Sequence, residues 1–93
     1  MEASFKIIYE KEVVERDIPA LPNPWDQKIK QTIEGRLTRN PALYGKPLRR
    51  LLTGYRKLRV GDYRVIYGVG SLTVRILIID HRSTVYQEVL KRI

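Results

Sequence analysis

Residues 56–67 place basic side chains where they could form a site for an anion. Apolar and basic residues alternate on either side of Gly61-Asp62, and successive side chains of a strand point to opposite faces of a sheet. The pattern therefore predicts two strands joined by a two-residue turn, with Lys57, Arg59 and Arg64 on one face. Three cations on one face could bind a phosphate, help to cleave a phosphodiester, or simply stay solvated.

The basic character extends beyond these three residues. Between residues 46 and 64 the chain has seven cations against a single acid, Asp62, and the cations are Lys46, Arg49, Arg50, Arg56, Lys57, Arg59 and Arg64. The whole chain carries a formal net charge of +8 over 93 residues. Such a charge predicts a polyanionic or acidic partner. A basic face is most often only solvated, however, so charge alone does not define a site.

The N-terminal segments must supply elements that support this hairpin. Residues 4–9 are typical of a strand, and residues 10–16 are typical of a short helix. We expect the prolines at positions 19 and 22 to end this helix, because proline cannot continue a helix and restricts the residue before it.

A second helix is predicted from Asn23-Pro24 to about Arg39. Asn23 is the expected cap, and proline fits the first helical position. Its apolar residues recur every four positions and define one buried side, at Trp25, Ile29, Ile33 and Leu37. We expect Trp25 to anchor the core rather than to stack on a base. Gly35 inside this helix costs about 1 kcal/mol relative to Ala unless close packing requires it.

The C-terminal half is expected to hold most of the sheet. Residues 41–47 are typical of a loop. We expect residues 48–52, which contain three leucines, to form an irregular or short extended segment that leads into the hairpin. A further strand covers residues 72–79, and its last four residues are apolar, as expected for a strand buried on both faces. Residues 84–93 predict a short helix capped by Ser83 or Asp80, with apolar residues facing the sheet at Val85, Val89 and Ile93.

The order of elements is therefore β-α-α-β-β-β-α. It predicts an α+β fold, with a small, mostly antiparallel sheet, an N-terminal helical pair packed on it and a short C-terminal helix. Residues 1–93 are expected to form a single domain. At this length the chain can bury one small core, and we do not expect a second.

Composition excludes several classes of function. The chain has no cysteine and only one histidine, His81, so we expect no disulfide, no metal site and no cofactor. No apolar run approaches the roughly 20 residues that span a bilayer, and the N-terminus lacks a signal-peptide pattern. We therefore expect a cytoplasmic protein without membrane contact.

Two motifs resemble the RelE/ParE superfamily of toxins of type II toxin–antitoxin systems. They are Arg59-Val60-Gly61-Asp62-Tyr63-Arg64-Val65-Ile66-Tyr67 and His81-Arg82-Ser83-Thr84-Val85-Tyr86. The resemblance covers the whole chain in length and element order, and we favour the RelE-like branch of mRNA interferases. It implies an endoribonuclease that docks on 16S rRNA and cleaves mRNA codons in the ribosomal A site.

The resemblance also implies which residues surround the scissile phosphate. In a cleavage without a metal, the 2′-hydroxyl attacks the adjacent phosphorus, so groups must take its proton, stabilise phosphoryl charge and protonate the leaving oxygen. Lys57 is the candidate base or electrostatic activator, because crowding by cations makes a lysine a better proton acceptor. Arg59 and Arg64 suit phosphate binding, since guanidinium does not deprotonate. Arg82 matches the arginine after the last strand, and Tyr86 would stack on a base or orient the 2′-hydroxyl.

Other residues are expected at the margin of this site. We predict that RNA is contacted by Arg49, Arg50, Arg56 and His81. For His81, a general-acid role and a plain capping role both remain open.

Plainer interpretations stand beside these roles. Arg64 could simply pair with Asp62 or Glu88, and Tyr86 could pack under the sheet with its hydroxyl at the edge. The whole protein could also be a ParE-type inhibitor of DNA gyrase, or an inactive RelE-fold binding module. A toxin of either kind implies a cognate antitoxin, whose partly disordered acidic segment wraps the basic sheet or displaces the C-terminal helix. Operator DNA would be bound only through that antitoxin.

Overall fold

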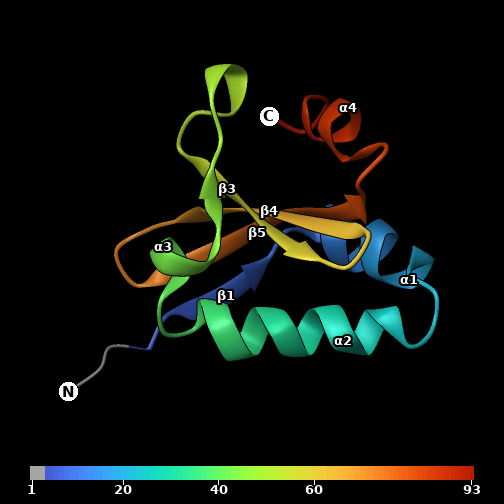
Figure 1. Ribbon diagram of the computed structural model, residues 1–93, viewed down its shortest axis with the longest axis horizontal. Coiled ribbons are helices and arrows are strands. Elements are labelled where there is room, and N and C mark those ends of the chain that lie inside the picture. Colours follow the sequence, from blue (N-terminus) through green and yellow to red (C-terminus); the bar gives the residue numbers. More distant parts are fainter. Residues whose placement is uncertain (1–3) are drawn as a thin grey trace.

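A five-stranded sheet forms the centre of the protein in a computed structural model that describes residues 4–93 (Figure 1). The strand order is β1-β5-β4-β3-β2, with β1 parallel to β5 and the other neighbours antiparallel. The strands are β1 Lys6–Tyr9, β2 Lys46–Pro47, β3 Tyr55–Val60, β4 Tyr63–Val69 and β5 Thr73–His81. The predicted α+β fold with a mostly antiparallel sheet is confirmed.

Helices cover both faces of this sheet. The long helix formed by α2 and η2 lies against one face, and α4 lies against the other. The helical segments are η1 Val13–Asp17, α1 Ile18–Ala20, α2 Trp25–Thr32, η2 Ile33–Leu37, α3 Pro41–Tyr44, η3 Arg50–Leu52 and α4 Val85–Val89. Among residues 4–93, no helix has the length and apolar character needed to cross a bilayer.

The ends of the first two helices differ from the predictions. The first helix does not end before Pro19 but continues through α1, because a wider π-helical turn, η1, precedes the proline and separates its ring from the preceding turn. Asn23 is not the cap of the second helix. That helix begins at Trp25 after Pro24, without a side-chain capping hydrogen bond.

The predicted loop over residues 41–47 is also wrong. Pro41 occupies the first turn of α3, where its missing N–H costs nothing, and Lys46–Pro47 then pairs with β3 as β2. The C-terminal helix is shorter than expected and has Thr84, not Ser83 or Asp80, at its N-cap. Ile93, which was expected to face the sheet, is 51% exposed.

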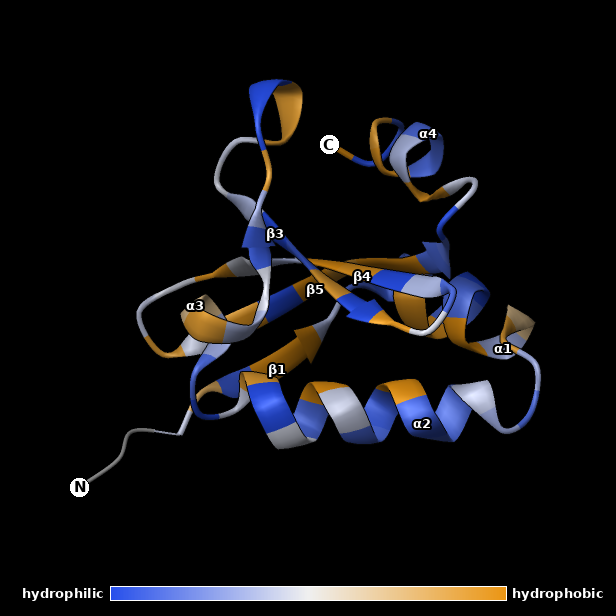
Figure 2. Ribbon diagram, viewed as in Figure 1, coloured by the Kyte–Doolittle hydropathy of each residue, from blue (hydrophilic) through white to orange (hydrophobic). Residues whose placement is uncertain are grey.

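The larger core lies between the sheet and the α2–η2 helix. The predicted buried side of this helix is confirmed for Ile29, Ile33 and Leu37, which are fully buried, and Trp25 packs against the same cluster. Leu58 and Val65 face them from the hairpin. Figure 2 shows the corresponding apolar stripe of the helix turned toward the sheet and its polar side turned outward.

A second apolar cluster lies on the opposite face, so the expectation of only one core is wrong. Ile66 and Ile78 from the sheet pack there with Val85 and Val89 of α4. An irregularity in the β4–β5 register, where Ile66 opposes Ile78 but Tyr67 opposes Ile76, places an extra residue, Leu77, in β5. Because such a bulge shifts the alternation of side chains, β5 contributes consecutive buried residues to both clusters, as its apolar run predicted.

Candidate active site

The β3–β4 hairpin brings two arginines face to face. The two-residue turn is as predicted, with Gly61 at a φ of 60°, and Arg59 is the direct cross-strand partner of Arg64. Lys57 lies two residues before Arg59 and therefore on the same face. Like charges directly opposite each other destabilise a sheet, and an anion bound between them would relieve this repulsion. The hairpin is thus suited to hold a phosphate.

Lys57 also reaches the C-terminal helix. Its Nζ donates a hydrogen bond of 3.1 Å to the hydroxyl of Tyr86 in α4 and lies 5.6 Å from the centre of the Tyr86 ring. The two residues are 29 positions apart in sequence. Tyr86 remains 38% exposed, so its ring is open to a ligand and does not pack under the sheet. The fold therefore brings together two of the predicted site residues in direct contact.

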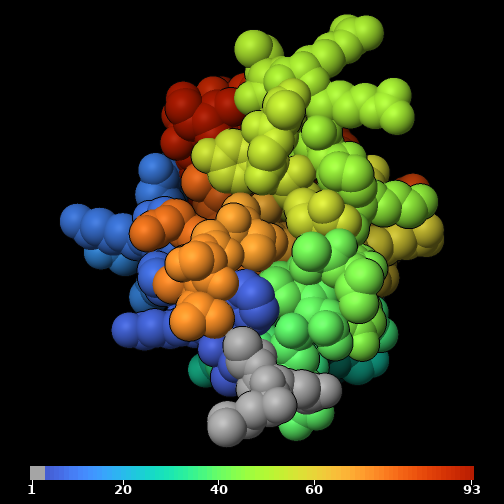
Figure 3. Space-filling view, turned by 90° about the vertical axis from the view of Figure 1, so that its left-hand side faces the viewer, coloured from blue at the N-terminus to red at the C-terminus, as the bar shows by residue number. Residues whose placement is uncertain are grey.

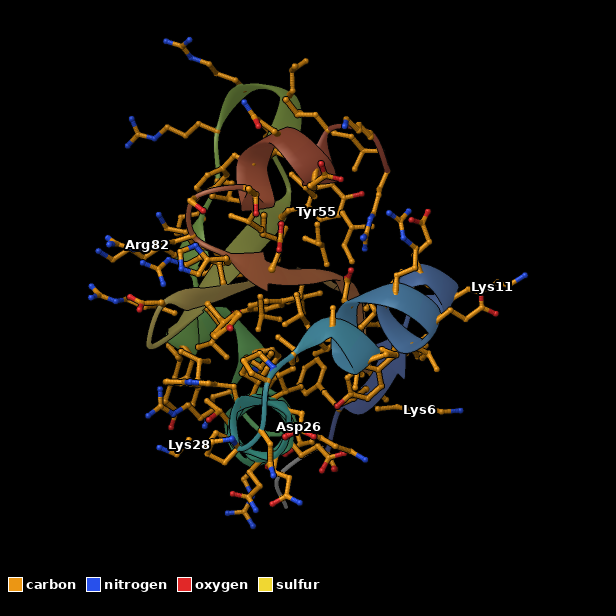
Figure 4. All side chains as sticks on the ribbon, turned by 90° about the vertical axis from the view of Figure 1, so that its right-hand side faces the viewer. Lys6, Lys11, Asp26, Lys28, Tyr55 and Arg82 are labelled. Carbon is orange, nitrogen blue, oxygen red and sulfur yellow. The ribbon has the colours of Figure 1, made fainter. Side chains whose placement is uncertain are left out.

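Arg64 and Arg82 lie at the turn end of the hairpin. Arg64 donates from Nη1 to the carbonyls of Gly61 and Tyr63, at 2.8 and 2.9 Å, and no ion pair joins it to Asp62 or Glu88 within the described part of the chain. The Nε of Arg82 is 3.6 Å from an Asp62 carboxylate oxygen, and both side chains are largely exposed. Figure 4 shows Arg82 extending to the side where other nitrogen-tipped side chains gather.

A groove of about 340 Å³ continues from these cations along the edge of β3. The strand β2 pairs only with Arg56 and Lys57, so within residues 4–93 the edge of β3 beyond Lys57 has no partner strand. Among the described residues, the groove is lined by Arg36, Tyr44, Lys46, Lys57, Leu58, Arg59 and Arg64. Five of these seven are cations and none is an acid, which makes the groove a strongly anion-attracting surface.

Arg56 lies on the opposite side of β3 from Lys57 and Arg59. It is half-buried beside Tyr67, its cross-strand partner, and its Nη2 donates a hydrogen bond to the carbonyl of Gly45. Burial raises the pKa of the Tyr67 hydroxyl, and the neighbouring Arg56 acts in the opposite direction. The structure therefore gives no support to the predicted RNA contact by Arg56, because its guanidinium is bound to the backbone of Gly45.

His81 is also separated from the phosphate-facing arginines. The bulge in β5 pairs His81 with Tyr63, whose ring lies 5.8 Å away, on the α2 side of the sheet. Its Nδ1 accepts a hydrogen bond from the backbone N–H of Ser83 at 3.1 Å and lies 2.8 Å from the Ser83 hydroxyl. This is a local turn and not the cap of α4, whose N-cap is Thr84. His81 pairs with Tyr63, next to Arg64 in β4, so its ring lies on the opposite face of the sheet from Arg64, and its general-acid role stays a prediction.

Arg49 and Arg50 do not line the groove. They are exposed in the segment between β2 and β3, and Arg50 has a positive φ of 59°. Figure 3 shows this yellow-green segment projecting from the top of the molecule. The predicted RNA contact by these two residues would thus belong to a docking surface rather than to the site around Lys57.

A larger groove, of about 650 Å³, lies elsewhere on the protein, next to the end of β1. Its lining mixes both signs of charge, and two of its three cations are paired within the protein: Arg75 contacts Glu10 at 3.0 Å and Arg92 contacts Glu12 at 3.4 Å. Size alone would select this groove, but the chemistry selects the smaller one.

Sequence reasoning missed three polar residues of the smaller groove, Arg36, Tyr44 and Lys46. Lys46 was counted among the cations of residues 46–64 but was not assigned to the site. Arg36 belongs to the outward-facing side of a helix, where a cation is usually only solvated, and Tyr44 belongs to a segment that was interpreted as a loop. Pro41, which can begin a helix, was the one signal for α3. Nothing in the sequence indicates that α3 lies beside β3.

This chain is similar to known proteins in both sequence and fold. A family model described as ParE toxin of type II toxin-antitoxin system, parDE, matches residues 5–86. Toxin RelG and toxin RelE of Mycobacterium tuberculosis are each 39% identical over 74 residues, which are 77% of this chain and 85% and 76% of those proteins.

Solved structures agree with this match. The RelBE2 toxin–antitoxin complex of Mycobacterium tuberculosis contains a chain that is 34% identical, with a TM-score of 0.80 over 87% of this chain and 94% of that chain. Toxin RelE of E. coli, in a mutant form in the free state, shares the fold at 19% identity, with a TM-score of 0.74 over 97% of this chain and 98% of that chain.

Fold and site together define a small α+β toxin with a basic hairpin. The chain belongs to the ParE toxin family of type II toxin–antitoxin systems, and its curated relatives are RelE-like toxins. The resemblance found in the sequence is thereby confirmed.

Proposed function

We propose that this toxin is an endoribonuclease that cleaves mRNA codons in the ribosomal A site. One observation carries the proposal: the 3.1 Å contact between Lys57 Nζ and the Tyr86 hydroxyl, beside the cross-strand pair Arg59–Arg64. A proton-handling group, an aromatic ring and two phosphate-binding guanidinium groups are the parts that attack by a ribose 2′-hydroxyl requires.

Each residue of the site has its own role in the proposed reaction. The 2′-hydroxyl gives its proton to the neutral amine of Lys57 and attacks the adjacent phosphorus. The bond to the 5′-oxygen breaks, and that oxygen takes a proton from water. Tyr86 stacks on the base and orients the 2′-hydroxyl. Arg59 and Arg64 stabilise the charge on the phosphoryl oxygens, and positioned donors of this kind contribute about 10²–10³-fold in rate. Arg82 completes the basic rim at the turn.

An antitoxin is the expected protein partner. The solved relative from Mycobacterium tuberculosis is a toxin–antitoxin complex, as are solved relatives from Methanococcus jannaschii and Staphylococcus aureus. The cations on the face of the hairpin, Lys57, Arg59 and Arg64, favour an acidic segment in that partner. Contact with operator DNA would occur only through the antitoxin.

Inhibition of DNA gyrase is the second candidate. It is favoured by the description of the matching family model, which names the ParE toxin. A gyrase inhibitor needs a protein-binding surface and no reacting groups, so the contact between Lys57 and Tyr86 would then have no catalytic purpose.

Ribosome cleavage separates the two candidates. Purified ribosomes carrying a defined mRNA are incubated with the full-length toxin, and the mRNA ends are mapped by primer extension. We expect cuts within the A-site codon that disappear with Arg64→Ala and Tyr86→Ala. Lys11→Ala, which removes an exposed cation far from Arg82 (Figure 4), is the charge-matched control and should cut normally. Intact mRNA together with loss of gyrase supercoiling would establish the second candidate instead.

A further inference from the structure

The groove beside β3 extends past the residues assigned to the reaction. Lys57, Arg59 and Arg64 form its inner part, and the outer part is formed by Arg36, Tyr44 and Lys46. These three come from η2, α3 and β2, which the sequence alone did not place near the hairpin. The outer part therefore needs an explanation of its own.

Residues of the sheet hold α3, the helix that carries Tyr44, in place. The Tyr67 hydroxyl, which is fully buried, donates a hydrogen bond of 2.7 Å to the carbonyl of Pro41, and Arg56 donates to the carbonyl of Gly45. A side chain at Gly45 would collide with the Tyr67 ring and hydroxyl. The helix α3 is thus fixed at both ends, and Tyr44 is presented by a rigid segment, as a binding site requires.

Tyr44 combines an exposed ring with a neighbouring guanidinium. Its side chain is 48% exposed, and the Arg36 guanidinium carbon lies 5.6 Å from the centre of its ring. Aromatic rings and guanidinium planes are the two kinds of surface on which the bases of single-stranded nucleic acid stack. Lys46 adds a charge for the backbone next to this pair.

We propose that the outer groove binds a second nucleotide of a single RNA strand, adjacent to the one held at Lys57. Its base stacks on Tyr44 beside Arg36, and Lys46 contacts its phosphate. The proposal rests on the proposed function for the identity of the strand as RNA. An acidic peptide is disfavoured, because an exposed aromatic ring partnered by a guanidinium offers a base a stacking surface that a carboxylate cannot use.

The test measures binding apart from cleavage. A fluorescently labelled 2′-O-methyl oligonucleotide cannot be cut by a 2′-hydroxyl attack, and its affinity for the full chain is measured by anisotropy over a range of salt concentrations. Tyr44→Ala should weaken binding about tenfold, as expected for loss of one stacked base, without changing the salt dependence. Tyr44→Phe keeps the ring and should bind like the wild type. Leu43→Ala, on the neighbouring residue that is 79% exposed and outside the groove, is the matched control.

A base-deletion series locates the nucleotide. Removing one base at a time should reveal one position whose loss costs the wild type about tenfold and costs Tyr44→Ala nothing, which damage to folding alone would not produce. Lys46→Gln should lower the slope of log affinity against log salt by about 0.7, the value for one phosphate contact on a single strand.

The outcomes separate this inference from the proposed function. If ribosomal cleavage occurs but no base position depends on Tyr44, the second-nucleotide site is wrong and the nuclease stands. If the base-specific effect of Tyr44 is found but ribosomal mRNA stays intact, the site stands and the nuclease is wrong. Equal weakening of a poly-glutamate peptide by Tyr44→Ala, with no base-specific effect on RNA, would identify an acidic-peptide site and overturn the inference.

Discussion

The guanidinium of Arg92 donates two parallel hydrogen bonds of 2.7 Å to the carboxylate of Asp17, across 75 positions of sequence. Both side chains are more than nine-tenths buried, and the hydrogen-bonded Asp17 raises the pKa of Arg92. Asp17 also accepts the N–H of Ile79 at 3.0 Å, and Arg92 also donates to the carbonyl of Leu77 at 3.2 Å. The pair therefore ties the end of the chain to the first helix and to the edge of β5.

Replacing Arg92 should destabilise the whole protein. Arg92→Ala leaves the Asp17 carboxylate buried without its partner, and removal of one member of a buried pair costs about 3–5 kcal/mol. Urea unfolding measures the loss. The exposed surface pair Lys91–Glu88, 3.3 Å apart, provides the control, because Lys91→Ala should change the free energy of unfolding by less than about 1 kcal/mol. Equal effects of the two substitutions would contradict the structural role of the Arg92–Asp17 pair.

Stability should decrease in alkaline solution because of Tyr9. Burial, and to a smaller extent Glu34, raises the pKa of Tyr9 to about 12, while an unfolded tyrosine titrates near pH 10. Above about pH 10 the unfolded chain loses this proton and the folded chain retains it, so the unfolded state is favoured increasingly up to about pH 12. Below about pH 10, Tyr9 is protonated in both the folded and the unfolded state, so the free energy of unfolding is not lowered by its titration.

Tyr9→Phe tests this dependence. Urea unfolding at pH 9 and pH 11 should show a smaller alkaline loss for the variant than for the wild type. The Tyr9 hydroxyl is buried and has no hydrogen-bond partner among the described residues, so the variant should also be at least as stable near neutral pH. An unchanged alkaline loss in Tyr9→Phe would rule out this residue as its source.

Gly35→Ala should stabilise the protein by about 1 kcal/mol. Gly35 lies inside η2, and a Cβ there would meet no atom within 4 Å, so the substitution gains helix propensity without a packing cost. Thermal unfolding measures the gain. Gly61→Ala is the contrasting variant and should be destabilising, since Gly61 has a positive φ and a Cβ there would collide with the Trp25 ring.

Lys57→Arg separates proton acceptance from charge. Arginine keeps the positive charge but does not deprotonate, so the single-turnover cleavage rate should decrease by about 100-fold or more, while affinity for a 2′-O-methyl oligonucleotide stays within a few-fold of the wild type. A variant that cleaves at nearly the wild-type rate would show that Lys57 only supplies charge.

Tyr86→Phe tests the hydroxyl that Lys57 contacts. The ring remains for stacking, so RNA affinity should be kept, whereas the cleavage rate should decrease by about tenfold or more because the 3.1 Å hydrogen bond from Lys57 is lost. Tyr86→Ala should reduce both quantities. If the phenylalanine variant cleaves normally, stacking alone explains the role of Tyr86.

Local patterns in the sequence were sufficient for the elements that depend on nearby residues. The alternation over residues 56–67 and the turn at Gly61-Asp62 predicted the hairpin, because side-chain direction in a strand is fixed by position alone. The four-residue spacing of Ile29, Ile33 and Leu37 predicted the buried face of the second helix for the same kind of reason. These predictions concern contacts between residues that are close along the chain.

The sequence by itself therefore determined the basic face of the hairpin, the fold class and the family. Only the tertiary structure decided which distant residues join that face, since the bulge at Leu77 directs His81 away from it and the packing of α4 brings Tyr86 to Lys57. Packing of α3 against Tyr67 likewise places Tyr44 beside the groove. Each of these positions depends on how elements far apart in sequence pack against one another. The periodicity of a short segment cannot predict such packing, because it reports only which residues of that segment share a face.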